Sequence, residues 1–134
     1  MRAAKSQSRA DSQAAAGRRR KRERAGRLAE LLAAAFLVAK GYRILGRRVR
    51  TRLGEIDLIA DRGRRLAFVE VKYRDDATDP AMTVSRRQSD RIARAAEQWV
   101  WSHPAYRSHA FGLDIVLVSR WRWPRHLKDG LQPI

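Results

Sequence analysis

The sequence predicts an α/β fold, in which helices pack against a single mixed sheet. Apolar residues recur at the spacing of an amphipathic helix in two stretches, and short apolar runs interrupted by polar residues occupy four others. Their chain order is helix, strand, strand, strand, helix, strand, a mixture that is typical of the α/β class. The helices are expected at 23–40 and 85–101, and the strands at 42–45, 54–60, 65–74 and 110–119.

The chain is long enough to form one domain with its own core. It has 134 residues, 44% of them hydrophobic, and a chain of this length buries a sizeable apolar interior. We expect residues 23–134 to form that domain. Residues 1–22 contain almost no large apolar side chain, so we expect a basic, disordered tail there.

The first expected helix ends at Gly41, a residue type that favours helix termination. Glu30 lies on this helix beside a stripe of small residues, which would let the helix backbone approach a sheet closely. Either Glu30 reaches the sheet, or it is a solvated glutamate paired with Arg27, and spacing alone favours the solvated alternative. The helical spacing itself is given by Leu28, Leu31, Leu32, Ala35 and Val38.

The composition is strongly basic. Lys and Arg number 30 against 14 Asp and Glu, a net charge of +16. Residues 1–24 hold nine basic and two acidic residues, so the remainder is basic by itself. A polyanionic partner follows, with nucleic acid ranked before an anionic membrane surface. A charge that serves solubility alone is the less favoured explanation.

Several classes of protein are excluded or disfavoured by what the sequence lacks. There are no cysteines, which excludes disulfides, thiolate zinc sites and cysteine nucleophiles. No apolar run approaches the roughly 20 residues of a membrane-spanning helix, and no signal peptide is visible. We therefore expect a cytoplasmic protein that does not bind a membrane.

The segment 54–74 contains the clearest functional pattern. It predicts two strands joined by a polar, glycine-containing turn at 61–64. Side chains alternate along a strand, so Glu70 and Lys72 share a face, and an antiparallel hairpin brings Asp57 close to Glu70. Charged groups in apolar strands are unfavourable unless something pairs with them, so these three residues indicate a site.

Two carboxylates and an ammonium at one end of a sheet suit metal-dependent hydrolysis. Asp57 and Glu70 would supply the oxygen ligands that Mg²⁺, or Mn²⁺ in its place, prefers. Such a cation stabilises charge on a phosphodiester and lowers the pKa of bound water. Lys72 would orient that water and offset developing charge.

The strings GEIDLIA and FVEVKYR resemble those of the PD-(D/E)xK nuclease superfamily, which has a restriction-endonuclease-like fold. Within it, they resemble the YraN-type family of uncharacterised, nuclease-like bacterial proteins, which are similar to archaeal Holliday-junction resolvases. The resemblance covers roughly residues 24–119 and implies a four-stranded mixed sheet in the order αβββαβ. It implies that Asp57, Glu70 and Glu30 bind the metal. The implied catalytic residues are Glu30, Asp57, Glu70 and Lys72.

The chain departs from that family pattern near the last strand. Gly112 and Leu113 precede Asp114, where a basic residue and a phenylalanine are expected. None of the departures removes a metal ligand, but contacts with the substrate are not inherited from the family. We expect Asp114 to be structural support for the site.

The second expected helix begins at Ser85, a favoured N-cap residue. Its buried face is expected to contain Ile92 and Trp99, and its opposite side is basic. Arginines on this helix and before the hairpin could contact a phosphate backbone, or could be solvated and protect an edge strand. These candidate nucleic-acid contacts are Arg47, Arg48, Arg50, Arg86 and Arg87.

Two segments remain. Asp75–Ala81 is acidic and contains a proline, so we expect a loop. Arg120–Leu127 interleaves tryptophan with arginine. We expect this segment either to bind nucleic acid or to form a tryptophan lid over the core. The sequence weighs these two alternatives equally.

The favoured function is a metal-dependent endonuclease that hydrolyses DNA phosphodiester bonds, with branched or damaged DNA as candidate substrates. The alternative is a non-catalytic module that binds DNA or RNA and retains the nuclease fold. The chain presents one site, and junction-cutting relatives act as dimers, so a homodimer is also expected. Its candidate interface residues are Trp101, Trp121 and Trp123.

Overall fold

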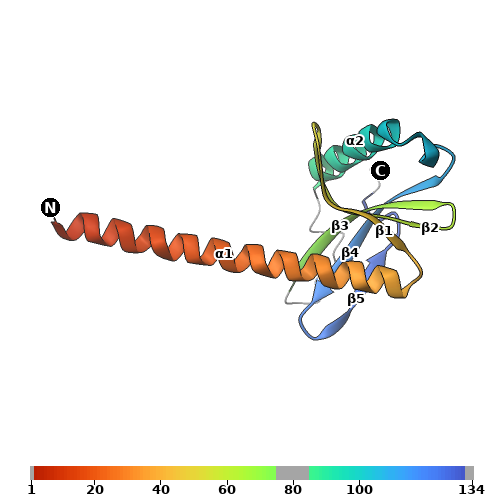
Figure 1. Cartoon of the computed structure of the whole chain (residues 1–134). Helices are drawn as coiled ribbons and strands as arrows, with labels where there is room; N and C mark the ends of the chain where they lie inside the picture. Colours follow the sequence, from red (N-terminus) through yellow and green to blue (C-terminus); the bar gives the residue numbers. More distant parts are fainter. Residues whose placement is uncertain (1, 75–84, 132–134) are drawn as a thin grey trace.

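The computed structural model describes residues 2–74 and 85–131, and the segment Asp75–Ala81, expected to be a loop, lies outside them. The chain is α/β, as predicted, with a long helix that extends well beyond the sheet (Figure 1). The elements in chain order are α1 (Arg2–Ala39), β1 (Arg43–Thr51), β2 (Gly54–Arg62), β3 (Arg65–Arg74), α2 (Arg86–Ser102), the 3₁₀ turn η2 (Pro104–Tyr106), β4 (Ala110–Ser119) and β5 (Arg122–Leu127).

The sheet is mixed, with the strand order β1-β2-β3-β4-β5. β3 and β4 are parallel, and the other neighbouring pairs are antiparallel. A parallel pair needs a crossover connection, and α2 lies in the segment that joins β3 to β4. α1 packs on one face of the sheet and α2 on the other, so each face has its own apolar cluster.

Within residues 2–74 and 85–131, the sheet has five strands, whereas the family resemblance implied four. The extra strand is β5, which lies in the tryptophan- and arginine-rich segment after β4. It pairs antiparallel with β4 and forms the edge of the sheet. Charged residues and proline, such as the arginines and Pro124 here, are common in edge strands, where they discourage further pairing. Because these residues interrupt the apolar pattern, the sequence did not predict this strand.

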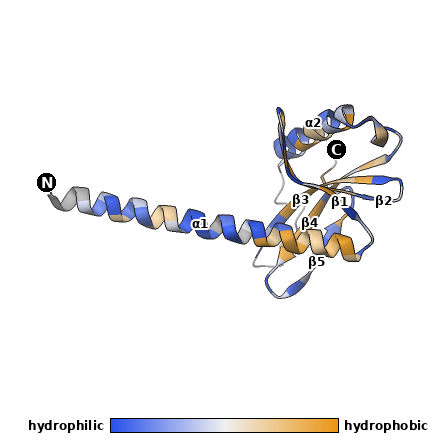
Figure 2. Cartoon of the chain, viewed as in Figure 1, coloured by the Kyte–Doolittle hydropathy of each residue, from blue (hydrophilic) through white to orange (hydrophobic). Residues whose placement is uncertain are grey.

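Helix α1 begins at Arg2, so residues expected to form a disordered tail are helical. Alanine, glutamine and arginine are all good helix formers, and helix propensity does not require an apolar face. Figure 1 shows the first half of α1 projecting away from the sheet, and Figure 2 shows that its residues are mostly hydrophilic. The predicted end near Gly41 is confirmed, since Gly41 has φ +93°.

Small residues form the face of α1 that lies on the sheet. Ala33 and Leu37 are fully buried, and Ala29 is 3% exposed. The stripe of small residues beside Glu30 is therefore the packing face, and it allows a close approach between helix and sheet. The leucines that gave the helical spacing lie on the outer side, where Leu28 is 59% and Leu31 is 51% exposed.

The hairpin of β2 and β3 forms as predicted, with antiparallel pairing from Leu58 opposite Val69 to Arg62 opposite Arg65. Its turn is tighter than expected, because Asp61 lies within β2, is buried, and accepts hydrogen bonds from the Arg43 guanidinium. Gly63 occupies the turn with φ +59°, a conformation that favours glycine.

A buried polar network joins β3, β4, β5 and α1 near the start of β3. Asp114 is fully buried and accepts two hydrogen bonds of 2.7 Å from Arg65. His126 Nε2 lies 2.7 Å from the second carboxylate oxygen, and His126 Nδ1 lies 2.6 Å from Lys40 Nζ. Asp114 is thus a structural residue, as expected, although its partners lie away from Glu70 and Lys72.

Candidate metal and nucleic-acid site

Asp57 lies where β2 separates from β3. The paired residues of the two strands end at Leu58 opposite Val69, and one residue further Asp57 Oδ2 accepts a hydrogen bond of 2.8 Å from the Val71 backbone N–H. This bond replaces the lost strand pairing and holds the Asp57 carboxylate against β3. The alternation of faces also breaks here, since Ile56 joins Ile59 in the cluster beneath α2.

Glu70 and Lys72 share one face of β3, as the alternation predicted. Lys72 Nζ lies 3.2 Å from Glu70 Oε1, and both side chains point toward α2, where Gln88 meets them. Gln88 Nε2 donates a hydrogen bond of 2.8 Å to Glu70 Oε1, and Gln88 Oε1 accepts one of 3.5 Å from Lys72 Nζ. The amide therefore holds the carboxylate and the ammonium side by side.

Asp57 lies close enough to Glu70 for the Glu70 carboxylate to affect its ionisation. Burial raises the pKa of Asp57 to about 7, and the neighbouring Glu70 carboxylate adds to the shift by charge repulsion and a side-chain hydrogen bond. The Val71 N–H opposes this by stabilising the ionised form. Two carboxylates in this arrangement hold a proton near neutral pH unless a cation takes its place.

The two carboxylates line a small open pocket of about 270 Å³ between the hairpin and α2. Gln88 and Arg91 contribute to its α2 side, so a bound anion would meet a guanidinium opposite the carboxylates. Among the residues that the structure describes, the lining consists of Gly54, Glu55, Asp57, Glu70, Gln88, Arg91 and Ile92.

Glu30 lies near this pocket but is paired elsewhere. Its carboxylate accepts a hydrogen bond of 2.7 Å from Arg48 Nε, and its charge contributes a small part of the rise in the pKa of Asp57. Arg48 has φ +51°, a backbone conformation that is uncommon for a non-glycine residue and often marks a functional position. The ion pair with Arg27 that spacing favoured is replaced by this pair with Arg48.

Asp57 and Glu70 fit a Mg²⁺ ion. Within residues 2–74 and 85–131, no three His, Cys, Asp or Glu side chains converge as a ready-made metal site. Mg²⁺ is commonly held by one or two carboxylates, with water and substrate phosphate completing its coordination. An acidic pair in which burial and the neighbouring Glu70 carboxylate raise the pKa of Asp57 therefore matches this cation, while Glu30 as a third ligand stays a prediction.

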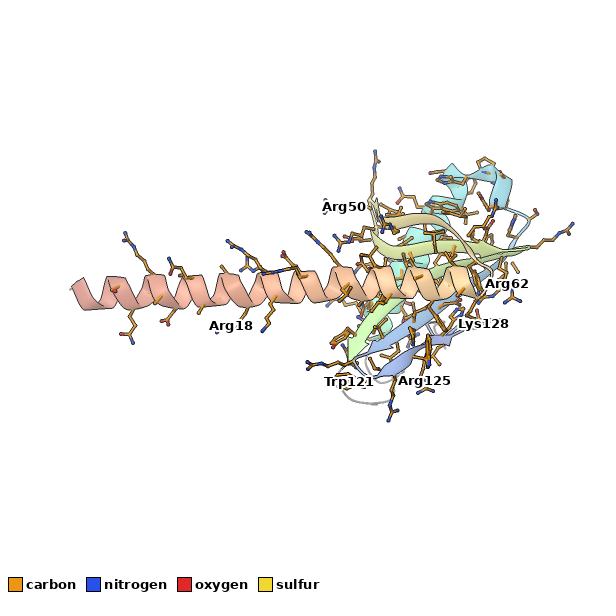
Figure 3. All side chains as sticks on the ribbon, turned by 60° about the horizontal axis from the view of Figure 1, so that its bottom comes forward. Arg18, Arg50, Arg62, Trp121, Arg125 and Lys128 are labelled. Carbon is orange, nitrogen blue, oxygen red and sulfur yellow. The ribbon has the colours of Figure 1, made fainter. Side chains whose placement is uncertain are left out.

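The basic residues expected to contact nucleic acid lie on the outer surface. Arg50 is 88% exposed at its side chain and lies 3.9 Å from Glu55. Arg47, Arg86 and Arg87 are also exposed. Trp121 and Trp123 are 86% and 85% exposed, so the alternative of a tryptophan lid over the core is wrong, and Figure 3 shows Trp121 at the periphery.

Gln88 is the site residue that the sequence analysis missed. The available signal was its position three residues after the Ser85 N-cap, whose Oγ accepts a hydrogen bond of 3.2 Å from the Gln88 N–H. That contact placed Gln88 in the first turn of α2, but only the crossover of α2 over β3 brings its amide to Glu70.

The mixed sheet between two helices, with Asp57, Glu70 and Lys72 gathered at one end of a hairpin, defines a protein of the restriction-endonuclease-like class. Residues 29–118 match the model of the uncharacterised protein family UPF0102. The chain belongs to this family, which confirms the YraN-type membership expected from the hairpin motif. The description of the family names no reaction.

The relatives are bacterial proteins of similar length. A UPF0102 protein of Nitrobacter winogradskyi is 52% identical over 103 residues, covering 77% of this chain and 87% of the relative. One from Rhodopseudomonas palustris is 50% identical over 104 residues, covering 78% and 77%. One from Sinorhizobium medicae is 49% identical over 105 residues, covering 78% and 86%.

In the part of the chain that the structure describes, no helix combines the length and apolarity required to cross a bilayer.

Proposed function

We propose that this protein is a metal-dependent endonuclease that hydrolyses phosphodiester bonds in DNA. The observation that carries the proposal is the packing of Asp57 beside Glu70, with Lys72 Nζ 3.2 Å from Glu70. Neighbouring carboxylates repel each other, and a cation relieves that repulsion. A protein that only bound nucleic acid would gain nothing from this acidic pair.

Asp57 and Glu70 would hold Mg²⁺ or Mn²⁺, and the bound cation would polarise the scissile phosphate and acidify a water. Lys72 Nζ lies 3.2 Å from Glu70 Oε1, where its ammonium would offset the charge that develops on the phosphate. Gln88 would hold Glu70 and Lys72 in position, because its amide hydrogen-bonds to both side chains. Glu30 would join the ligands only after leaving Arg48.

The basic surface would bring the polyanionic substrate to this pocket. Arg91 lines the pocket itself, and exposed arginines lie on β1 and at the start of α2. Such contacts with phosphate supply affinity and position without reading sequence. The proposed contacts remain Arg47, Arg48, Arg50, Arg86 and Arg87.

The test is cleavage of labelled duplex, single-stranded and branched DNA with Mg²⁺ or Mn²⁺. We expect metal-dependent cutting that Asp57→Asn and Lys72→Ala each reduce by at least about 100-fold, as expected for groups that act directly on the reacting phosphate. Glu97→Gln removes an exposed carboxylate from α2 and serves as the control, with activity close to wild type.

A non-catalytic module that binds DNA or RNA is the second candidate. It is favoured by the pairing of Glu30 with Arg48, because only Asp57 and Glu70, of the three ligands that the family pattern implies, then line the pocket. In that case Asp57→Asn and Lys72→Ala would leave nucleic-acid binding unchanged, and neither wild type nor variant would cut any of the DNA substrates.

A further inference from the structure

A second groove lies between α1 and the end of β3. Its volume is about 530 Å³, within the range of ligand-binding clefts. One wall belongs to the part of α1 that passes the edge of the sheet, and Figure 3 shows Arg18 on this part of the helix. The lining residues are Arg18, Lys21, Gly26, Val71, Lys72, Tyr73 and Arg74.

The groove combines positive charge with an apolar floor. Arg18 and Lys21 supply cations from α1, and Arg74 supplies one from the end of β3. Val71 and Tyr73 also line the groove, and Tyr73 is 37% exposed. None of these seven lining residues is acidic, so the lining complements an anion that also carries flat apolar surfaces.

Lys72 connects this groove to the carboxylate pocket. Lys72 is one of the residues that line the groove, while its ammonium lies 3.2 Å from Glu70 Oε1 and 3.5 Å from Gln88 Oε1 on α2. At Gly26, a Cβ atom would meet no heavy atom within 4 Å, so the helix wall is open there. A chain lying in the groove would therefore pass directly beside the proposed catalytic lysine.

We propose that this groove binds a single strand of DNA, and that Arg18 and Lys21 on α1 guide the strand into it. The sugar–phosphate backbone follows Arg18, Lys21 and Arg74, while a base lies on Tyr73. Sites for single strands pair cationic tracks with aromatic platforms, because unpaired bases expose their faces. A duplex hides those faces, and it would make no use of the apolar floor. The placement of the scissile bond beside Lys72 rests on the proposed nuclease function.

The first experiment measures binding of a fluorescent 20-nucleotide single strand to the full chain in EDTA, where no cutting occurs. Arg18→Ala/Lys21→Ala should weaken binding at least about fivefold and reduce the salt dependence of log Kd by about 1.4, the value for two lost phosphate contacts to a single strand. The control is Arg9→Ala/Arg19→Ala, which removes the same charge from the same helix outside the groove and should leave the salt slope nearly unchanged.

The second experiment tests the apolar floor. Tyr73→Ala should weaken single-strand binding about 5- to 150-fold, the effect of losing one stacked base, while Tyr73→Phe should bind like wild type. Binding of a 20-base-pair duplex should respond to neither substitution. Circular dichroism and thermal unfolding of each variant verify that α1 and the sheet remain folded.

Three results would overturn the proposal that the groove binds a single strand. One is an equal loss of single-strand affinity in the two double variants, which would indicate that the charge of the helix attracts DNA without a defined site. The others are insensitivity to Tyr73→Ala and tighter binding of duplex than of single strand. Because these measurements exclude metal, they separate the two proposals: binding in the groove without any cutting would retain the groove and reject the nuclease.

Discussion

At the scale of single residues, Asp57 and Asp114 show how environment decides the state of a carboxyl group. Burial and Glu70 raise the pKa of Asp57 to about 7. Burial acts on Asp114 in the same direction, but hydrogen bonds from Arg65, His126 and the Asp129 N–H outweigh it and lower the pKa to about 2. Asp114 is thus a permanent anion that holds the fold, whereas Asp57 is an anion that requires a cation.

The raised pKa of Asp57 predicts how stability depends on pH in the metal-free protein. Because the pKa of Asp57 in the folded protein, about 7, exceeds the ordinary aspartate value of 3.8, the protonated group favours folding. This contribution to stability is lost as pH rises from about 4 through 7. Urea unfolding in EDTA should therefore show wild type losing on the order of 2 kcal/mol relative to Asp57→Asn between pH 5 and 8. Glu97→Gln is the control, and an identical pH profile in wild type and Asp57→Asn would contradict the prediction.

Gly112 is explained by the ion pair that passes over it. A Cβ atom there would lie 2.7 Å from Arg65 Cζ and 2.9 Å from Asp114 Oδ1, so Gly112→Ala would displace the guanidinium that neutralises a buried carboxylate. We expect a loss of about 2–4 kcal/mol in the free energy of unfolding. In Gly17→Ala, the new Cβ meets nothing within 4 Å, and the variant should be as stable as wild type or slightly more. Equal stability of the two variants would show that the Arg65 side chain can move away from the new Cβ without loss of stability.

At the scale of elements, α2 serves both the fold and the site. It covers the hairpin of β2 and β3 with Ala95, Ala96 and Trp99, and its first turn carries Gln88 to Glu70. α1 has a comparable double role, with small residues on the sheet and basic residues beyond it. Gln88 lies next to the buried Ser89, so the packing of α2 fixes the position of this site residue.

Ser85 links the stability of α2 to the geometry of the site. Ser85→Ala removes the acceptor of the Gln88 N–H and should destabilise the protein by about 1 kcal/mol. Fraying of the first turn would also remove Gln88 from Glu70 and Lys72. The rate of DNA cutting should therefore fall by more than the loss of folded protein explains. Ser102→Ala removes a hydroxyl at the other end of the helix, where it bonds to Gln98 O. A comparable loss of cutting in that variant would mean that the effect is not local.

At the scale of the whole molecule, charge and apolar surface are both unevenly distributed. Basic residues follow the projecting half of α1, and Figure 2 shows apolar residues concentrated where α1 crosses the sheet. Large apolar side chains also remain on the surface, where exposed patches often mark contacts with a partner. They include Leu28, Leu31, Leu32, Val38, Trp101, Trp121 and Trp123.

We predict a homodimer, with the exposed Trp101, Trp121 and Trp123 as the interface residues that the sequence analysis proposed. Light scattering at micromolar concentration should give twice the mass of the chain, and Trp121→Ser/Trp123→Ser should shift the population toward monomer. Arg120→Ser/Arg122→Ser changes the same hairpin without removing apolar surface and should remain dimeric. A monomeric wild type would remove the homodimer from consideration.

Much of the molecule could be predicted from local patterns. The strand at 110–119 coincides with β4, the cap at Ser85 and the end of α1 are where they were expected, and the faces of β3 follow the pleat. Each of these depends on neighbours in sequence: the spacing of apolar residues, a hydroxyl before a helix, a glycine after one. The same local alternation indicated that Glu70 and Lys72 lie side by side.

The sequence by itself determined the α/β class, the basic charge and the acidic hairpin, because periodicity, composition and short-range turns need no partner. Tertiary structure decided the features that depend on contact between distant segments. β5 is a strand because β4 offers it an edge, Glu30 pairs with Arg48 because α1 crosses β1, and Gln88 reaches Glu70 because α2 covers β3. The groove beside Lys72 has the same origin, since its two walls are more than 40 residues apart in the chain and meet only when α1 packs on the sheet.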